Sequence, residues 1–160
     1  IVAMGRFCHR PIYASVTGDD EEAIDAALRD MALGNVEERA AHTLSGGERQ
    51  RMYLAQLLAQ DASVVLLDEP TSHLDIQYQS EILRALRSLV SERGWTVGVV
   101  LHDLNLAFHF CDRLVFLKAG KVAAKGTVAD VATADVVRET YGVAVDMSVN
   151  GDRPHVRVIY

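Results

Sequence analysis

The sequence predicts an α/β fold built around a parallel β-sheet. Two short apolar runs, at 64–67 and 96–101, have the length and composition of buried strands, and an amphipathic helical pattern separates them. A third apolar run follows at 114–117 after a short helical pattern. Because strands and helices alternate at βαβ spacing, we expect the strands to be parallel members of one sheet.

The first half of the chain is expected to be mainly helical. Pro11 and Gly18 interrupt the first 18 residues, which we expect to be irregular. A helix is expected over 20–33, with Gly34 ending it, because its apolar residues recur on one face and four acidic residues favour its N-terminus. A second helix is expected after the glycine pair at 46–47.

The remaining elements are read from the same patterns. The run VVLL at 64–67 is expected to be a strand covered on both faces, because all four residues are apolar. Gly94 is expected to close a helix that begins at Ile76. Further on, we expect short helices at 104–111, 128–132 and 134–141, and hairpin turns at Gly120-Lys121 and Asn150-Gly151.

Composition excludes some classes of function. The net charge of −6 and the lack of a basic face argue against nucleic-acid binding. No apolar run approaches the roughly 20 residues of a membrane-spanning helix. The histidines lie without metal-ligand spacing, so we expect none of them, His73 included, to be a metal ligand.

The stretch LSGGERQR, Leu44 to Arg51, places a serine and two glycines before a helical pattern. Ser45 and Glu48 form the S-x-x-E pattern of a capping box, which is a purely structural reading. Gly46 and Gly47 would be unfavourable if this segment served only as a helix cap. Each glycine inside a helix lowers the stability of the helix by up to about 1 kcal/mol relative to alanine. They are explained if the helix N-terminus must approach an anion closely. The two readings are compatible, and both are kept.

The stretch VVLLDEPTSHLD, Val64 to Asp75, ends an apolar strand in two carboxylates. Ligands of open parallel sheets bind beyond the carboxyl ends of the strands. Asp68 therefore suits Mg²⁺ binding, and Glu69 suits a general base that activates water. The alternative is that both are ordinary surface acids at the end of a strand.

The stretch VVLHD ends the second strand in His102. A histidine there can reach a bound γ-phosphate and help to orient water. The alternative is an ordinary histidine at a strand–helix junction, with Asp103 as the N-cap of the next helix.

Together and in this order, the three stretches resemble the ATP-binding cassette (ABC) ATPases. LSGGERQR looks like the signature motif, VVLLDEPTSHLD looks like Walker B followed by the D-loop, and VVLHD looks like the switch histidine. The resemblance implies part of a P-loop NTPase (RecA-like) parallel-sheet core with an α-helical subdomain and a C-terminal β-hairpin. It divides the chain into 1–60, the helical signature subdomain; 61–126, the core; and 127–160, C-terminal helices and hairpin.

The resemblance also implies roles for single residues. ABC ATPases bind ATP between two head-to-tail subunits, so Ser45, Gly46, Gly47 and Glu48 would contact the nucleotide of the partner subunit. Asp68 would bind Mg²⁺, and Asp75 would contact the partner. Glu69 would be the catalytic base and His102 the γ-phosphate sensor. Glu48 replaces the commoner glutamine of the motif, and its negative charge is expected to point away from the phosphate.

No G-x-x-x-x-G-K-[ST] loop occurs in the sequence, although the family needs one. We expect the chain to be the C-terminal part of such an ATPase, inactive by itself. The ending TADVVRETYGVAVDMSV resembles that of importers for iron–siderophores, haem and cobalamin. The resemblance implies an ATP-hydrolysing dimer on integral-membrane permease subunits, peripheral to the cytoplasmic face of the bacterial inner (plasma) membrane. The alternative is a non-catalytic half-cassette that lends its signature loop to a partner ATPase.

Overall fold

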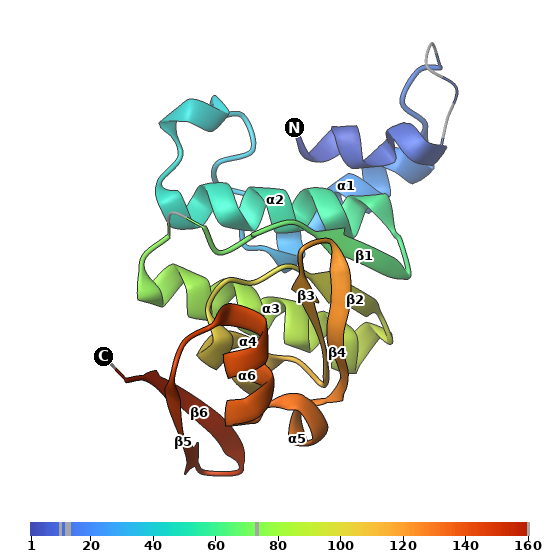
Figure 1. Cartoon of the computed structure of the whole chain (residues 1–160). Coiled ribbons are helices and arrows are strands. Elements are labelled where there is room, and N and C mark those ends of the chain that lie inside the picture. Colours follow the sequence, from blue (N-terminus) through green and yellow to red (C-terminus); the bar gives the residue numbers. More distant parts are fainter. Residues whose placement is uncertain (10, 12–13, 73, 160) are drawn as a thin grey trace. The chain divides into compact units, whose positions relative to one another are not determined.

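A computed structural model describes residues 1–9, 11, 14–72 and 74–159 of the chain (Figure 1). The chain divides into two compact units, unit 1 at Ile1–Val99 and unit 2 at Val100–Tyr160. Each unit has its own cluster of buried apolar side chains. The division differs from the three segments expected from the sequence, and those segments remain a prediction. His73 lies outside the described residues.

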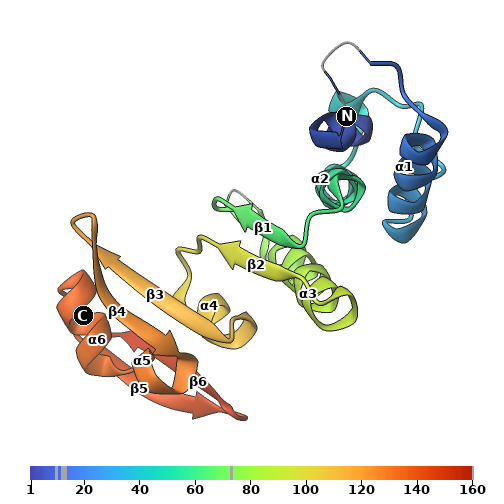
Figure 2. The ribbon, with the colours of Figure 1, turned by 90° about the vertical axis from the view of Figure 1, so that its right-hand side faces the viewer.

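Unit 1 is arranged around one helix, α2. Both η1 and α1 pack against α2, and α3 also contacts it (Figure 2). Ala55 and Ala59 of α2 are fully buried in the resulting core. The bounds of the helices are η1 Val2–His9 (3₁₀), α1 Gly18–Asp30, η2 Ala41–Thr43 (3₁₀), α2 Gly46–Gln60 and α3 Ile76–Arg93.

The expectation that the first 18 residues are irregular is wrong, because Val2–His9 forms η1. Tertiary contacts explain the difference. Gly5 lies so close to α2 that a Cβ there would be 2.4 Å from the carbonyl oxygen of Gln56. Arg6 donates to the carbonyl of Ala59 at 2.9 Å and to the carboxylate of Asp20 at 2.8 Å. A helical segment stabilised by distant partners leaves little signal in local sequence.

The helix expected over 20–33 is present as α1, with shifted ends. Thr17 is its N-cap and forms a capping box with Asp20, so the helix begins before the expected residue. It ends at Asp30, and Ala32 takes a positive φ of 53° in the following turn. The expectation that Gly34 ends the helix is therefore wrong by several residues.

Strands β1, Val64–Leu67, and β2, Thr96–Val99, pair in parallel, with Val64 opposite Thr96. The βαβ crossover through α3 is confirmed, although β2 is shorter than expected. The expectation that β1 is covered on both faces is wrong, since Val65 is 4% exposed and Leu66 is 81% exposed. Only the side chains that face the core of unit 1 are buried.

Unit 2 contains two antiparallel hairpins and three short helices. The third apolar run of the sequence pairs only with β4 among the described residues, so it does not extend the parallel sheet. Phe108, Phe116 and Val137 form the centre of the core. The elements are α4 Leu104–Phe110, β3 Arg113–Lys118, β4 Lys121–Thr127, α5 Val128–Val131, α6 Ala134–Tyr141, β5 Val145–Asn150 and β6 Arg153–Val158.

Side chains fasten the C-terminal hairpin to α4. The amide of Asn105 donates to the carbonyl of Val156 at 3.1 Å and accepts from its N–H at 2.8 Å. Arg153 donates to the carbonyl of Cys111 at 3.2 Å, at the end of α4. The hairpin expected around Asn150-Gly151 is confirmed, with Gly151 at a φ of 67°.

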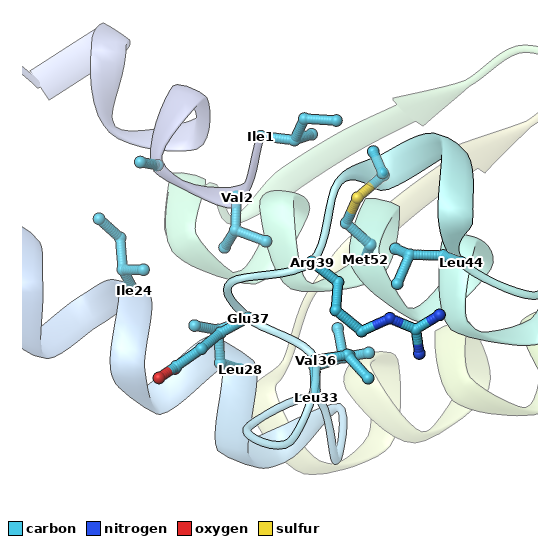
Figure 3. A pocket seen from close by; sticks show the side chains of 12 residues that line it. Ile1, Val2, Ile24, Leu28, Leu33, Val36, Glu37, Arg39, Leu44 and Met52 are labelled. Atoms are coloured by element: carbon cyan, nitrogen blue, oxygen red, sulfur yellow. The ribbon is translucent and has the colours of Figure 1, made fainter.

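The core of unit 1 leaves a cavity of about 330 Å³ between η1, α1 and the start of α2 (Figure 3). Its walls are mainly apolar, and Glu37 and Arg39 are its charged members. Leu44, which immediately precedes the serine and glycines of the signature sequence, is one of the wall residues. Of the helices in the described part of the chain, none is long and apolar enough to cross a membrane.

The ion pair of Arg6 and Asp20 predicts a pH-dependent stability. The hydrogen bond from Arg6, then that from the N–H of Thr17, lowers the pKa of Asp20 from 3.8 to about 2. Its carboxylate therefore stabilises the fold fully above pH 3.8, and this contribution is lost as the pH falls toward 2. Asp20→Asn should lower the free energy of unfolding at neutral pH and flatten its decline in acid, measured by urea denaturation. Asp19→Asn, at an exposed position beside it, is the control and should keep the wild-type pH profile.

Candidate functional site

The signature sequence forms the N-terminus of α2, as its pattern predicts. Ser45 is the N-cap, and its hydroxyl accepts from the N–H of Glu48 at 3.3 Å. The carboxylate of Glu48 accepts in return from the N–H of Ser45 at 2.8 Å. The predicted capping box is confirmed. Because the first N–H groups of a helix lack partners within it, the remaining donors at this end belong to Gly46 and Gly47.

The two glycines differ in their surroundings. Gly46 is exposed, whereas Gly47 is buried under the ring of Tyr78 from α3. No acceptor for the N–H of either glycine is recorded within the described ranges. The exposed Gly46 offers an unpaired donor at a helix N-terminus, where the helix dipole is positive, and such an end suits an anion.

Hydrogen bonds with Ser45 and the nearby Arg39 stabilise the negative charge of Glu48. The N–H of Ser45, followed by its hydroxyl, lowers the pKa of the carboxyl group, so the side chain is ionised at neutral pH. Arg39 lies 3.7 Å from the carboxylate and offsets part of its charge. The capping box holds the Glu48 side chain at the N-terminal end of α2, and its direction relative to a bound phosphate stays a prediction.

Asp68 and Glu69 follow β1 directly, and both are exposed. Glu69 has a positive φ of 47°, which is uncommon for a residue with a side chain. The hydroxyl of Ser72 donates to the Glu69 carboxylate at 2.8 Å, and the N–H of Ser72 donates to the Glu69 carbonyl at 3.0 Å. The turn therefore fixes the direction of the Glu69 side chain beyond the carboxyl end of the strand.

Asp75 and Asp103 each cap a helix. The carboxylate of Asp75 accepts from the N–H of Tyr78 at 3.0 Å at the start of α3. Asp103 accepts from the N–H groups of Asn105 and Leu106 at the start of α4, which confirms its reading as an N-cap. His102 is exposed and belongs to unit 2, whereas the other predicted site residues all belong to unit 1.

The Asp68 carboxylate suits an Mg²⁺ ion whose other ligands are nucleotide phosphates and water. No group of three or more His, Cys, Asp or Glu residues able to hold a metal occurs among the residues that the structure describes. Mg²⁺ in nucleotide sites is typically bound by one or two carboxylates together with phosphate oxygens and water. A single exposed carboxylate at Asp68 is consistent with that arrangement.

Comparison with known proteins gives the family. The model of the ABC transporter family matches residues 6–72, which include the signature sequence and the Asp68-Glu69 pair. The ferric enterobactin transport ATP-binding protein FepC of Escherichia coli K12 is 39% identical over 89% of this chain and 53% of its own length. The hemin import ATP-binding protein HmuV of Pseudomonas fluorescens Pf0-1 is also 39% identical, over 99% of this chain and 62% of its own length.

Residues 6–72 belong to the ABC transporter family. An inward-facing structure assigned to the metal-chelate type of ABC transporter superimposes on the whole chain with a TM-score of 0.90 and 26% identity, covering 66% of that protein. The likeness confirms the predicted fold class, an α/β part of a P-loop NTPase cassette. The chain spans about half the length of the curated relatives it matches.

Three residues of this ABC segment that support the predicted site were missed in the sequence. Arg39 faces Glu48, Ser72 holds Glu69, and Tyr78 covers Gly47. For Ser72, the spacing of three residues from Glu69 is a usable local signal. Arg39 and Tyr78 reach the site from separate segments, so their roles depend on tertiary packing.

Removing the Ser45 hydroxyl should weaken the start of α2. Ser45→Ala removes the acceptor for the N–H of Glu48, and the loss of such an N-cap costs about 1 kcal/mol of the free energy of unfolding. Urea denaturation measures the difference. Ser63→Ala, an exposed serine outside any helix cap, is the control. Equal stability of the two variants would contradict the capping role.

Proposed function

We propose that the protein containing this chain is the ATP-hydrolysing subunit of an ABC importer. The observation that supports it best is the N-terminus of α2, where the Gly46 and Gly47 N–H groups and the Ser45 hydroxyl lie together. Such a surface suits the γ-phosphate of a nucleotide. Because the signature motif acts on the nucleotide of the other subunit in this family, the protein works as a head-to-tail dimer.

The remaining roles are proposed from the resemblance of the motifs to those of ABC ATPases. Asp68 would hold Mg²⁺, which would neutralise charge on the transferred phosphate. Glu69 accepts the proton of the attacking water, with the Ser72 hydroxyl orienting its carboxylate. His102 contacts the γ-phosphate and reports its presence. Asp75 contacts the partner subunit near the start of α3.

The class of substrate is proposed from the relatives. FepC and HmuV are described as acting in transport of ferric enterobactin and import of hemin. We place this subunit in the same group, powering uptake of an iron chelate, haem or cobalamin through integral-membrane permease subunits. It is peripheral to the cytoplasmic face of the bacterial plasma membrane, and its helical subdomain docks on the permease.

Glu69→Gln tests the catalytic role in the full-length protein. The amide cannot accept the proton of water, so ATP turnover should fall by about 10²-fold to 10⁴-fold while ATP binding and dimerisation persist. Phosphate release and sedimentation measure the two properties. Glu92→Gln is a matched control, because Glu92 also accepts a hydrogen bond from a serine hydroxyl.

Unchanged turnover in Glu69→Gln would remove Glu69 from the mechanism and favour a non-catalytic module. The importer role is tested separately in cells that carry Glu69→Gln as their only copy. Uptake of the transported iron chelate, haem or cobalamin should stop. Normal uptake of all three classes would contradict the importer assignment.

Gly46→Leu tests the signature surface. The side chain would project where the partner's nucleotide approaches, so ATP-dependent dimerisation should be lost while the monomer keeps its nucleotide affinity. Gly34→Leu is the control, because Gly34 has open space around it and lies outside the motif. Normal dimerisation of Gly46→Leu would show that no nucleotide binds at this surface.

A further inference from the structure

Tyr78 makes a close contact with the signature glycines. A Cβ built on Gly47 would lie 2.5 Å from Cε1 of Tyr78, 3.3 Å from Cδ1 and 3.4 Å from Cζ. A Cβ on Gly46 would lie 3.9 Å from Cε2. The ring therefore packs tightly on the buried Gly47 and lies at ordinary contact distance from the exposed Gly46, in the first turn of α2. A side chain at position 47 would therefore clash with the Tyr78 ring, whether or not a ligand is bound nearby.

The position of Tyr78 is itself fixed. Its N–H donates to the carboxylate of Asp75 at 3.0 Å. One residue later, the amide of Gln79 donates to the carbonyl of Thr71 at 3.2 Å, which ties α3 to the loop after Glu69. The ring thus joins the segment that carries Asp75 to the segment that carries Gly46 and Gly47, and both segments belong to unit 1.

A glycine pair needs such external support. Glycine has the widest backbone freedom of any residue, so two in succession weaken the first turn of a helix. The capping box holds Ser45 and Glu48, whereas the glycines between them have no side chains of their own to pack. Contact with the ring restricts the orientations available to their N–H groups.

The space around the ring leaves room for movement. A cavity of about 320 Å³ borders it and is also lined by Gly47, Leu54 and Ile82. On the side of this cavity the ring is not enclosed by other side chains, so its contact with Gly47 is a main restraint on its position.

We propose that Tyr78 is a positioning residue that holds Gly46 and Gly47 in the conformation that receives the partner subunit's nucleotide, and that it couples this conformation to Asp75. The proposal rests on the proposed function in one respect, namely that the signature surface contacts a nucleotide in trans. The contact between the ring and the glycines is independent of that function.

The test uses two readouts in the full-length protein. Hydrogen exchange of the segment 46–48 without nucleotide reports the conformation of the loop through the N–H of Glu48, which donates to the Ser45 hydroxyl at 3.3 Å. ATP-dependent dimerisation, measured by sedimentation in a Glu69→Gln background, reports whether this loop binds the nucleotide of the partner subunit. Tyr78→Ala should speed exchange at 46–48 and weaken dimerisation about ten-fold, a typical size for coupling between sites. Tyr78→Phe keeps the ring and should restore both properties.

Tyr53→Ala is the matched control, because it removes a tyrosine that is 49% exposed on the same helix α2. It should leave exchange at 46–48 and dimerisation at wild-type levels. Tyr78→Leu replaces Tyr78→Ala if that variant fails to fold, since leucine keeps apolar volume without a flat ring. Nucleotide affinity of the monomer should stay unchanged in every variant, which separates positioning from general damage.

The outcomes are distinct. Faster exchange together with weaker dimerisation supports the proposal. Wild-type exchange in the variant that lacks the ring overturns it, as does wild-type dimerisation despite faster exchange. If the wild-type protein neither binds ATP nor dimerises, the proposed function fails. Exchange at 46–48 then still decides whether Tyr78 holds the loop.

Discussion

The packing of η1, α1 and α2 in unit 1 depends on the hydrogen bonds that the guanidinium of Arg6 donates. It joins three elements, because it lies in η1, donates to Asp20 of α1 and donates to the carbonyl of Ala59 in α2. Side-chain exposure is 12% for Arg6 and 5% for Asp20, so the pair is shielded from water. A buried ion pair with further hydrogen bonds fixes geometry more than it adds stability. Here it ties η1 to α1 and to the C-terminal end of α2, the helix whose N-terminus carries the signature residues.

The parts of the fold that could be predicted are those with local causes. The capping box of Ser45 and Glu48 lies within four residues, and the hairpin at Gly151 is set by one turn. Asp103 was identified as a cap from its place at a strand–helix junction. By contrast, η1 forms because Gly5 and Arg6 meet α2, more than 50 residues away in sequence. No periodicity within residues 1–18 contains that information.

The candidate site shows the same division. The residue types at Asp68 and Glu69 were identified from a short apolar run followed by two acids. The positive φ of Glu69 and its bond from Ser72 follow from the turn into Pro70 and Thr71, which the motif alone does not define. Likewise, the hydrogen bond from the Ser45 N–H and the nearby Arg39 stabilise the Glu48 carboxylate at the helix N-terminus, and Arg39 comes from a separate segment.

The open face of β1 has a thermodynamic consequence. The heat-capacity change of unfolding grows with the apolar surface that unfolding newly exposes to water. In this segment, which spans about half the length of its curated relatives, Leu66 and Val64 are 81% and 60% exposed, so within it they contribute little to that change. A segment with such a strand has a smaller heat-capacity increment than one whose central strand is fully covered. Its stability therefore varies less steeply with temperature on either side of the maximum.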